Sequence, residues 1–295
     1  MREKDSELDR LVTRLDDWML EALNRLDMPN RLKESMAYSI QAGGKRIRPR
    51  LIFATLDAFR KDMEIGIPAA AAVEMIHTYS LIHDDLPSMD NDDFRRGKPT
   101  NHRVFGEAMA ILAGDALLTH SFQILAEIPE QVADLRTKLA LVLELAKAAG
   151  PEGMVAGQVA DLEGENRTLT LEELEYIHTR KTGRLIGFSV LAGALLAGAE
   201  QPLLKQLRRF AGHIGLAFQI RDDILDVEGS TETIGKTAGK DQAQKKSTYP
   251  SLLSLSGAKD QLQNQIREAL VILHGLPLNT KRLEQLTLII GNRDF

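Results

Sequence analysis

The chain has 295 residues, 43% of them hydrophobic, which is enough to bury a sizeable core. Its formal net charge of −5 argues against a general affinity for nucleic acid, which requires a net basic surface. There is no cysteine, so disulfides, thiolate metal sites and cysteine nucleophiles are excluded, and any metal must be held by oxygen or histidine.

The first predicted element is an amphipathic helix near the N-terminus. Its leucines recur at three- and four-residue steps or their sums, a pattern typical of a helix that packs on one side: Leu8, Leu11, Leu15, Leu23 and Leu26. Similar periodic segments predict helices over 31–42, 47–61, 67–85, 105–126, 132–149, 171–198, 203–228, 251–274 and 280–290. No alternating Val/Ile/Thr run is bounded by hairpin turns, so the pattern predicts an all-α fold.

Three further features bear on organisation. Thr170 and Glu173 form a capping box that predicts a helix start at Leu171. No linker rich in Pro or Ser divides the chain, so residues 1–295 are predicted to form a single domain. The most apolar stretch, Leu185 to Ala199, is shorter than the roughly 20 residues of a membrane span, and the N-terminus lacks the apolar segment of a signal peptide. We therefore expect a cytoplasmic protein with no membrane association.

Two aspartate clusters each follow a long apolar stretch, where unpaired carboxylates are costly. They are Asp84, Asp85 and Asp90, and then Asp222, Asp223 and Asp226. Like carboxylates this close repel unless a cation neutralises them. Mg²⁺ fits best, because one or two carboxylates commonly hold it while water and substrate phosphates complete the octahedron. A single acidic run is equally typical of solvated surface charge, but two such runs favour a diphosphate ester bound through Mg²⁺.

The spacing within each cluster predicts its local geometry. Asp222 and Asp226 are four residues apart on a helix and share a face, with Gln219 one turn back. On an unbroken helix, Asp84 and Asp90 would point about 240° apart at ~100° per residue. Pro87 lies between them, so we expect the helix to end or bend there and both carboxylates to point together.

Basic residues gather in three further segments, Gly43 to Arg48, Arg95 to Lys98 and Gly235 to Lys246. Arginine offers a bidentate fork, lysine a mobile point charge, and glycine a close backbone approach, all of which suit phosphate oxygens. Each segment alone is also typical of a surface patch, and Gly43-Gly44-Lys45 lacks the spacing of a P-loop. With two carboxylate clusters, these segments predict two anionic groups, one held through metal and one held directly.

Together these motifs resemble those of the trans-isoprenyl diphosphate synthases. The segment Asp84 to Gly97 looks like the first aspartate-rich motif of that family, and Phe218 to Asp226 resembles the second. Segments 43–49, 181–183 and 235–237 match three more motifs in order. Phe94 and Arg221 depart from the usual residues, but neither change removes a ligand. The resemblance implies a bundle of about ten or more helices around a central deep cavity, the fold of isoprenoid synthases.

The resemblance also implies a reaction between two small-molecule substrates. An allylic diphosphate ionises, the double bond of isopentenyl diphosphate attacks the carbocation, and the released diphosphate takes the proton. Three Mg²⁺ ions per active site are implied, on Asp84, Asp90 and Asp222, with Asp85 and Asp226 as further or second-shell ligands. The family's habit favours a homodimer. Nothing in the resemblance calls for a nucleic acid partner.

The remaining site residues take their roles from the same resemblance. The allylic diphosphate is expected to contact Arg95, Lys181, Lys236 and Lys246. Isopentenyl diphosphate is expected to contact Gly44, Lys45, Arg48, His77 and Arg96 without metal. The carbocation is expected to face oxygen dipoles of the Lys181 carbonyl, the Thr182 hydroxyl and the Gln219 amide. Alone, a histidine in an apolar helix, as His77 is, more often belongs to the core.

Product length is expected to depend on Tyr79 and its neighbour Ser80. Tyr79 lies five residues before Asp84, about 7.5 Å deeper at ~1.5 Å per residue. An aromatic ring there resembles the cavity floor of bacterial farnesyl diphosphate synthases, which implies (2E,6E)-farnesyl diphosphate as the product. The alternatives are a geranyl or geranylgeranyl diphosphate synthase, a terpene cyclase and, from another class, a silent partner subunit, although such a subunit would show damaged aspartate motifs.

Overall fold

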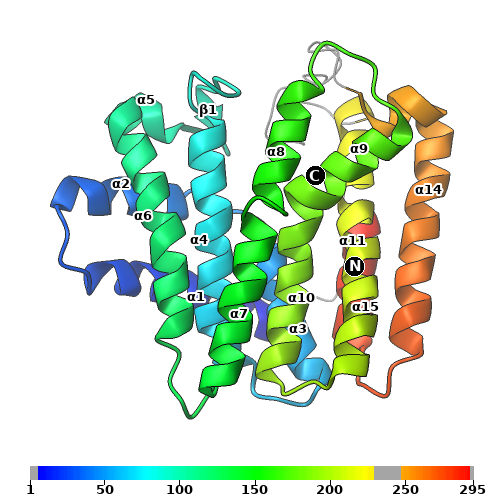
Figure 1. The fold of residues 1–295 in the computed structure, drawn as a ribbon, viewed down its shortest axis with the longest axis horizontal. Helices are drawn as coiled ribbons and strands as arrows, with labels where there is room; N and C mark the ends of the chain where they lie inside the picture. The colour runs from blue at the N-terminus through cyan, green and yellow to red at the C-terminus, as the bar shows by residue number, and fades with distance from the viewer. Residues whose placement is uncertain (1–5, 229–246, 293–295) are drawn as a thin grey trace.

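A computed structural model describes residues 6–228 and 247–292, and it confirms the all-α prediction (Figure 1). The helices before the middle of the chain are α1 Ser6–Asn24, α2 Asn30–Ile40, α3 Ile47–Ala58, α4 Ile67–Asp84, α5 Asn101–Phe105, α6 Glu107–Ala126 and α7 Leu135–Ala149. They are followed by α8 Met154–Glu163, α9 Leu171–His178, α10 Arg184–Leu196, α11 Gln201–Glu228, α14 Tyr249–His274 and α15 Lys281–Asn292. A 3₁₀ turn, η1, spans Met63–Gly66, and a π-helical turn, η2, spans Thr179–Gly183.

The structure differs from the sequence prediction in three places. The segment predicted as one helix over 171–198 is interrupted by η2, although the capping box at Thr170 does begin α9. Helix α8 was not predicted, because it buries Met154 and Gly157 but exposes apolar side chains that blur its periodicity. A short antiparallel hairpin, β1 Phe94–Arg95 with β2 Lys98–Pro99, follows the first aspartate cluster.

The core is formed by helices that bury an apolar stripe or nearly their whole surface. The predicted stripe of α1 is confirmed for Leu8, Leu11, Leu15 and Leu23, which are at most 2% exposed, whereas Leu26 lies beyond the end of the helix and is only partly buried. Helix α10, which contains most of the apolar stretch Leu185 to Ala199, buries most of its side chains against α3, α7 and α11. Two stretches, Met63–Asp84 and Glu107–Ala126, are long and apolar enough to cross a membrane by length and composition alone. The first is 72% buried inside the protein, which is the environment of a core helix.

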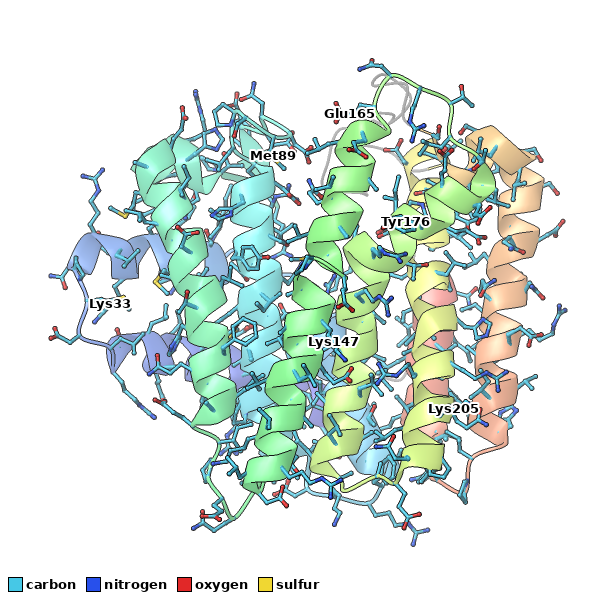
Figure 2. All side chains as sticks on the ribbon, in the orientation of Figure 1. Lys33, Met89, Lys147, Glu165, Tyr176 and Lys205 are labelled. Carbon is cyan, nitrogen blue, oxygen red and sulfur yellow. The ribbon has the colours of Figure 1, made fainter. Side chains whose placement is uncertain are left out.

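Helices α4 and α11 place both aspartate clusters at the same end of the molecule. Each of these helices ends there, α4 beside the β-hairpin and α11 before residues 229–246 (Figure 1). Met89, in the turn after α4, and Tyr176, on α9, lie toward this end, whereas Lys205 at the start of α11 lies toward the opposite one (Figure 2). The candidate site is therefore assembled from helix ends that are far apart in sequence.

Candidate functional site

The first aspartate cluster lies in the turn that ends α4. Asp84 is the last residue of the helix, and the backbone N–H of Asp90 donates a 2.8 Å hydrogen bond to its carbonyl oxygen. The predicted break near Pro87 is thus observed, and it brings Asp84 and Asp90 back together. Burial raises the pKa of Asp84 to about 6; the charge of Lys181 opposes this shift and that of Asp90 adds to it. Such a carboxylate favours a cation beside it.

Asp85 contacts an arginine of the hairpin. Its carboxyl Oδ1 accepts bonds from Nε of Arg95 at 2.7 Å and from Nη2 at 2.5 Å. Asp85 is 3% exposed, and burial raises its pKa although the hydrogen bond from Arg95 opposes the shift. The pair fixes the guanidinium of Arg95 against the first cluster. Asp85 therefore holds an arginine in place, and its predicted part in metal binding stays a prediction.

Lys181 lies on the π-helical turn η2 and faces the first cluster. Its Nζ donates a 2.7 Å hydrogen bond to Oδ2 of Asp161 on α8. Burial alone would lower the pKa of Lys181, but the charges of Asp161 and Asp84 outweigh it and raise the pKa. Asp161 was missed by sequence reasoning, because only the packing of α8 against η2 brings it to Lys181.

The packing of α8 on η2 depends on Gly157. A Cβ atom built on Gly157 would lie 2.2 Å from the backbone nitrogen of Lys181, so only glycine permits this approach. π-Helical turns are often found at functional sites, where they redirect backbone groups. The close contact holds the turn that carries Lys181 and Thr182, and both side chains are partly exposed.

A second part of the site is rich in arginine. Burial lowers the pKa of Arg48, while the nearby charges of Glu74 and Asp222 oppose that shift. Asp222 on α11 is thus within electrostatic range of Arg48 on α3, which relates the second aspartate cluster to the basic segment. Burial and the positive charges of Arg48 and Arg96 lower the pKa of His77 well below its usual value. A neutral imidazole among arginines forms a basic cluster suited to an anion held without metal.

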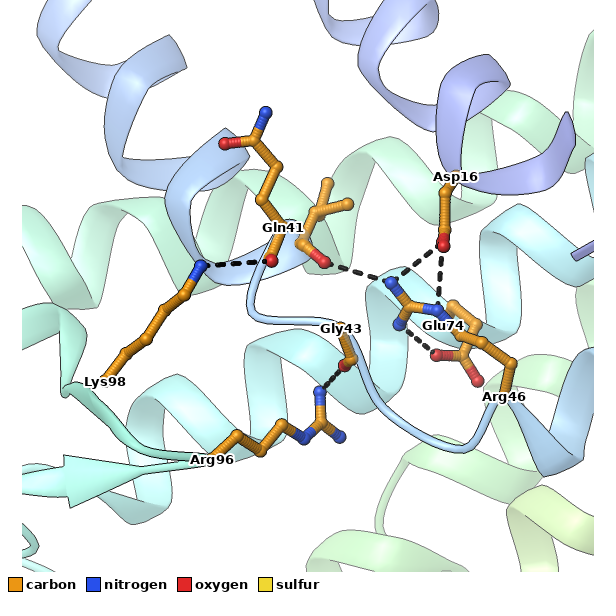
Figure 3. A network of polar contacts seen from close by, with 8 residues as sticks. Asp16, Gln41, Gly43, Arg46, Glu74, Arg96 and Lys98 are labelled. Carbon is orange, nitrogen blue, oxygen red and sulfur yellow. Dashed lines mark hydrogen bonds and ion pairs between the residues drawn. The ribbon is translucent and has the colours of Figure 1, made fainter. Parts of the chain in front are cut away.

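The glycines of the first basic segment lie against Arg96, a member of this basic cluster. The guanidinium of Arg96 donates a hydrogen bond to the carbonyl oxygen of Gly43 (Figure 3). Gly44 has a φ of 139°, and a Cβ there would lie 2.8 Å from the same guanidinium. Lys45, by contrast, is exposed. The absence of a side chain at Gly44 thus makes room for the guanidinium of Arg96, while the predicted close approach of this backbone to a phosphate stays a prediction.

Arg46 anchors the same segment from inside the protein. Its Nη1 donates a 2.7 Å hydrogen bond to Oε2 of Glu74 on α4, and both side chains are 3% exposed. Nε donates to Asp16 on α1 at 2.9 Å, and Nη2 to the carbonyl of Ile40 at 3.0 Å (Figure 3). Arg46 itself has a left-handed φ of 50°. Sequence reasoning missed Glu74, although a lone carboxylate in an apolar helix was a signal.

The second aspartate cluster is divided between two environments. Gln219, Asp222 and Asp226 are all partly exposed on α11, as expected for one face of a helix. Asp223 is 5% exposed and instead contacts His178 and the start of α14. It does not join its neighbours on the shared face. The predicted residues Lys236 and Lys246 lie outside the described residues.

Tyr79 and Ser80 lie one to two turns before Asp84 on α4. Tyr79 is 7% exposed, and its ring meets that of His83 edge-on with centroids 5.7 Å apart. Burial raises the pKa of Tyr79 to about 12, and the charge of Asp84 adds to the shift. The Ser80 hydroxyl donates a 2.9 Å hydrogen bond to the carbonyl of His77 in its own helix. The Tyr79 ring therefore lies among core residues behind the first cluster.

The donor set fits a hard cation such as Mg²⁺. Asp84, Asp90, Asp222 and Asp226 offer only carboxylate oxygens, and the raised pKa of Asp84 marks a carboxylate short of positive charge. Within residues 6–228 and 247–292, no three acidic or histidine side chains converge into a complete metal site. Mg²⁺ needs no such cage, since it commonly takes one or two carboxylates and completes its shell with water and substrate phosphates.

Known proteins are similar to this chain in sequence and in fold. The polyprenyl synthetase family model matches residues 29–274. The chain is 58% identical over 272 residues to the farnesyl diphosphate synthase of Geobacillus stearothermophilus, with 92% of each chain covered. It is 51% identical over 248 residues to the chloroplastic geranylgeranyl pyrophosphate synthase of Capsicum annuum, covering 84% of this chain and 67% of that one. The geranyltransferase of Helicobacter pylori, solved in complex with magnesium and isoprenyl diphosphate, matches with a TM-score of 0.83 and 33% identity, covering 98% and 97% of the two chains.

Proposed function

The chain belongs to the polyprenyl synthetase family, and we propose that it condenses isopentenyl diphosphate with dimethylallyl or geranyl diphosphate to give (2E,6E)-farnesyl diphosphate. The observation that carries the proposal is the pairing of two anion sites of different chemistry. One lies at the carboxylates of Asp84 and Asp90, the other at the arginines beside His77. The higher identity to a farnesyl than to a geranylgeranyl diphosphate synthase favours the fifteen-carbon product.

The allylic diphosphate binds at the carboxylate site. Asp84, Asp90 and Asp222 hold Mg²⁺, with Asp226 as a further ligand, and the occupancy we propose is three ions. When bound, Mg²⁺ neutralises the charge that develops on the diphosphate as the carbon–oxygen bond breaks. The magnesium bound to the geranyltransferase of Helicobacter pylori supports this assignment. Arg95, held by Asp85, and Lys181, held by Asp161, add fixed positive charge, and we assign Lys236 and Lys246 to the same diphosphate.

Isopentenyl diphosphate binds at the basic cluster of Arg48, Arg96 and His77. Arg48, Arg96 and neutral His77 contact its phosphates, with exposed Lys45 at the rim and Gly44 allowing close approach. Arg48 lies near Asp222, so the two diphosphates are held side by side and the alkene is directed at the allylic carbon.

The carbocation formed between the two sites needs stabilisation by dipoles. We assign this role to the carbonyl oxygen of Lys181, the hydroxyl of Thr182 and the amide oxygen of Gln219. The leaving diphosphate takes the proton from the condensed product, so no side chain is needed as general base. Tyr79, with Ser80 beside it, limits the length of the product from behind Asp84. We further propose that residues 1–295 form one domain and that the protein acts as a homodimer.

One incubation tests the proposal. Labelled isopentenyl diphosphate is supplied with dimethylallyl, geranyl or farnesyl diphosphate, with Mg²⁺ and separately with EDTA. We expect farnesyl diphosphate from the first two starters, little elongation of the third, and no product in EDTA. A twenty-carbon product would support the geranylgeranyl alternative. Absence of any condensed product with Mg²⁺ and both substrates would refute the enzymatic proposal and leave the silent partner subunit as the better reading.

A further inference from the structure

Asp223 stands between the two carboxylates proposed to hold metal, yet its side chain is buried elsewhere. Its Oδ2 accepts a 2.9 Å hydrogen bond from the backbone N–H of Tyr249. The same oxygen lies 3.2 Å from Nε2 of His178. An ionised carboxylate offers only acceptors, so the imidazole supplies the hydrogen at Nε2. Both side chains are nearly inaccessible, with exposures of 7% for Asp223 and 11% for His178.

These contacts join three segments that are distant in sequence. His178 is the last residue of α9 and directly precedes the π turn η2, which carries Lys181 and Thr182. Asp223 lies on α11, and Tyr249 is the first residue of α14. The rings of His178 and Tyr249 stack with centroids 5.8 Å apart, which closes the contact. We call Asp223, His178 and the Tyr249 backbone the clasp.

We propose that Asp223 is a positioning residue, whose clasp on His178 and on the start of α14 holds the π turn of Lys181 and Thr182 in register with the metal-binding face of α11. The proposal rests on the function proposed above, because it concerns the groups assigned to the carbocation. A π turn is closed by i→i+5 hydrogen bonds, each spanning one residue more than those of an α-helix, and this rare geometry is held by its surroundings. Gly157 packs against one side of this turn, and the clasp fixes its N-terminal end.

Loss of the clasp should change which product is formed, an effect that a loss of fold stability alone would not have. If the turn shifts, the dipoles of Lys181 and Thr182 no longer face the carbocation, and water competes better with isopentenyl diphosphate for it. Water then gives the allylic alcohol and inorganic diphosphate in place of the condensed product. The ratio of alcohol to condensed product is set by the active molecules alone, so a smaller folded fraction does not change it.

The test compares three variants with the wild-type enzyme in the presence of geranyl and isopentenyl diphosphates and Mg²⁺. His178→Ala removes the donor, and His178→Gln restores an amide nitrogen at the same reach. We expect His178→Ala and Asp223→Asn to raise the alcohol-to-product ratio by about tenfold or more, since a misplacement near 1 Å can cost about a hundredfold in rate. His178→Gln should return most of the wild-type ratio.

Two controls distinguish a positioning role of Asp223 from an effect of lost stability and from metal binding. Thr287→Val removes a buried hydroxyl that donates to the carbonyl of Leu283 on α15, so it measures the effect of stability loss and should leave the ratio unchanged. The Mg²⁺ concentration at half-maximal rate should rise in Asp222→Asn but not in Asp223→Asn. A shift in both would make Asp223 a metal ligand and overturn the proposal.

The remaining outcomes distinguish failure of the clasp proposal from failure of the proposed function. An unchanged alcohol-to-product ratio in His178→Ala would overturn the clasp, and because this variant keeps Asp223, it serves even if Asp223→Asn does not fold. An equal ratio in His178→Ala and His178→Gln would also overturn it, since the restored donor would then have no effect. Absence of condensed product with the wild-type protein would instead refute the proposed function itself.

Discussion

The backbone N–H of Asp90 donates a 2.8 Å hydrogen bond to the carbonyl oxygen of Asp84, and this bond closes the turn on which the first anion site is built. The turn returns the chain to the end of α4, so the carboxylates of Asp84 and Asp90, both partly buried, lie close together. Burial and the charge of Asp90 both disfavour ionisation of Asp84, whose pKa is raised to about 6 in spite of nearby Lys181. A bound cation would offset the free-energy cost of ionising Asp84 at this position.

Stability without metal should therefore depend on pH through Asp84. Because the folded pKa lies above the usual 3.8, protonation favours the folded state, and this stabilisation is complete below pH ~4 and lost as the pH rises through about 6. In EDTA at pH 8, Asp84→Asn should raise the free energy of unfolding by roughly 2 to 3 kcal/mol, at about 1.4 kcal/mol per pKa unit. Urea unfolding of the wild type and of Asp84→Asn at pH 4 and 8 measures this difference in the free energy of unfolding. Equal free energies of unfolding for the two proteins at pH 8 would contradict the raised pKa of Asp84.

Turnover should depend on a carboxylate from each cluster. Asp84→Ala and Asp222→Ala should each lower kcat/KM by orders of magnitude, because the metal that neutralises the leaving group loses a ligand. The matched control is Asp260→Ala on the exposed face of α14, which should keep wild-type turnover. Circular dichroism checks that the helices persist. Near wild-type rates in either cluster variant would rule out the assigned metal sites.

Product length should respond to Tyr79. Its ring is 7% exposed behind Asp84, so Tyr79→Ala opens space in the direction of chain growth and should shift the product toward twenty carbons or longer. Tyr79→Phe retains the ring and should leave the product at fifteen carbons. Chromatography of the dephosphorylated products measures the distribution. If the alanine variant gives the wild-type distribution, the ring does not limit elongation.

The Arg46–Glu74 pair should support the isopentenyl diphosphate site. Glu74→Gln leaves Arg46 buried without its full counter-charge, and breaking a buried pair typically costs about 3 to 5 kcal/mol. The variant should also raise the KM for isopentenyl diphosphate more than that for geranyl diphosphate, because Arg46 anchors the segment of Lys45 and Arg48. The control is Glu64→Gln, which breaks the exposed pair with Arg14 and should cost at most about 1 kcal/mol. Equal effects on both KM values would argue against this anchor.

Gly157 should be intolerant of a side chain. In Gly157→Ala the new Cβ meets the backbone nitrogen of Lys181 at 2.2 Å, so the π turn must move, and both thermal stability and kcat should fall. Gly187 on α10 is the matched control, since a Cβ there meets nothing within 4 Å. Gly187→Ala should raise stability by up to about 1 kcal/mol, because alanine favours a helix over glycine. Thermal unfolding and steady-state kinetics distinguish the two variants.

The spacing of residues along the sequence was enough to predict much of the helical structure and of the aspartate clusters. The helix periodicity placed the core leucines of α1, and the four-residue spacing of Asp222 and Asp226 put both on one face of α11. Pro87 indicated the end of α4 near Asp84. The roles of Lys236 and Lys246 stay predictions, since those residues lie outside the described part of the chain, and the limit set by Tyr79 stays a prediction until products are measured.

Other features depended on contacts that no local pattern records. The π turn of Lys181 interrupts a segment whose apolar pattern reads as one continuous helix, because it is held by packing against α8 and α11. In the sequence, nothing indicates which basic residues Asp161 and Glu74 contact. In the structure, Asp161 pairs with Lys181 and Glu74 with Arg46. Asp223 belongs to the second cluster by sequence, but its buried carboxylate contacts His178 and the start of α14 and does not share the face of Asp222 and Asp226.

The sequence by itself determined most of the helices, the family and the two aspartate clusters, because periodicity and motif spacing act between residues a few positions apart. Tertiary structure decided which members of each cluster face the site. Asp84 and Asp90 meet through a turn that local sequence already indicates, whereas Asp223 is drawn away by His178, 45 residues earlier in the chain. Such a choice depends on which buried hydrogen-bond partner is within reach, and only the packed helices bring that partner there.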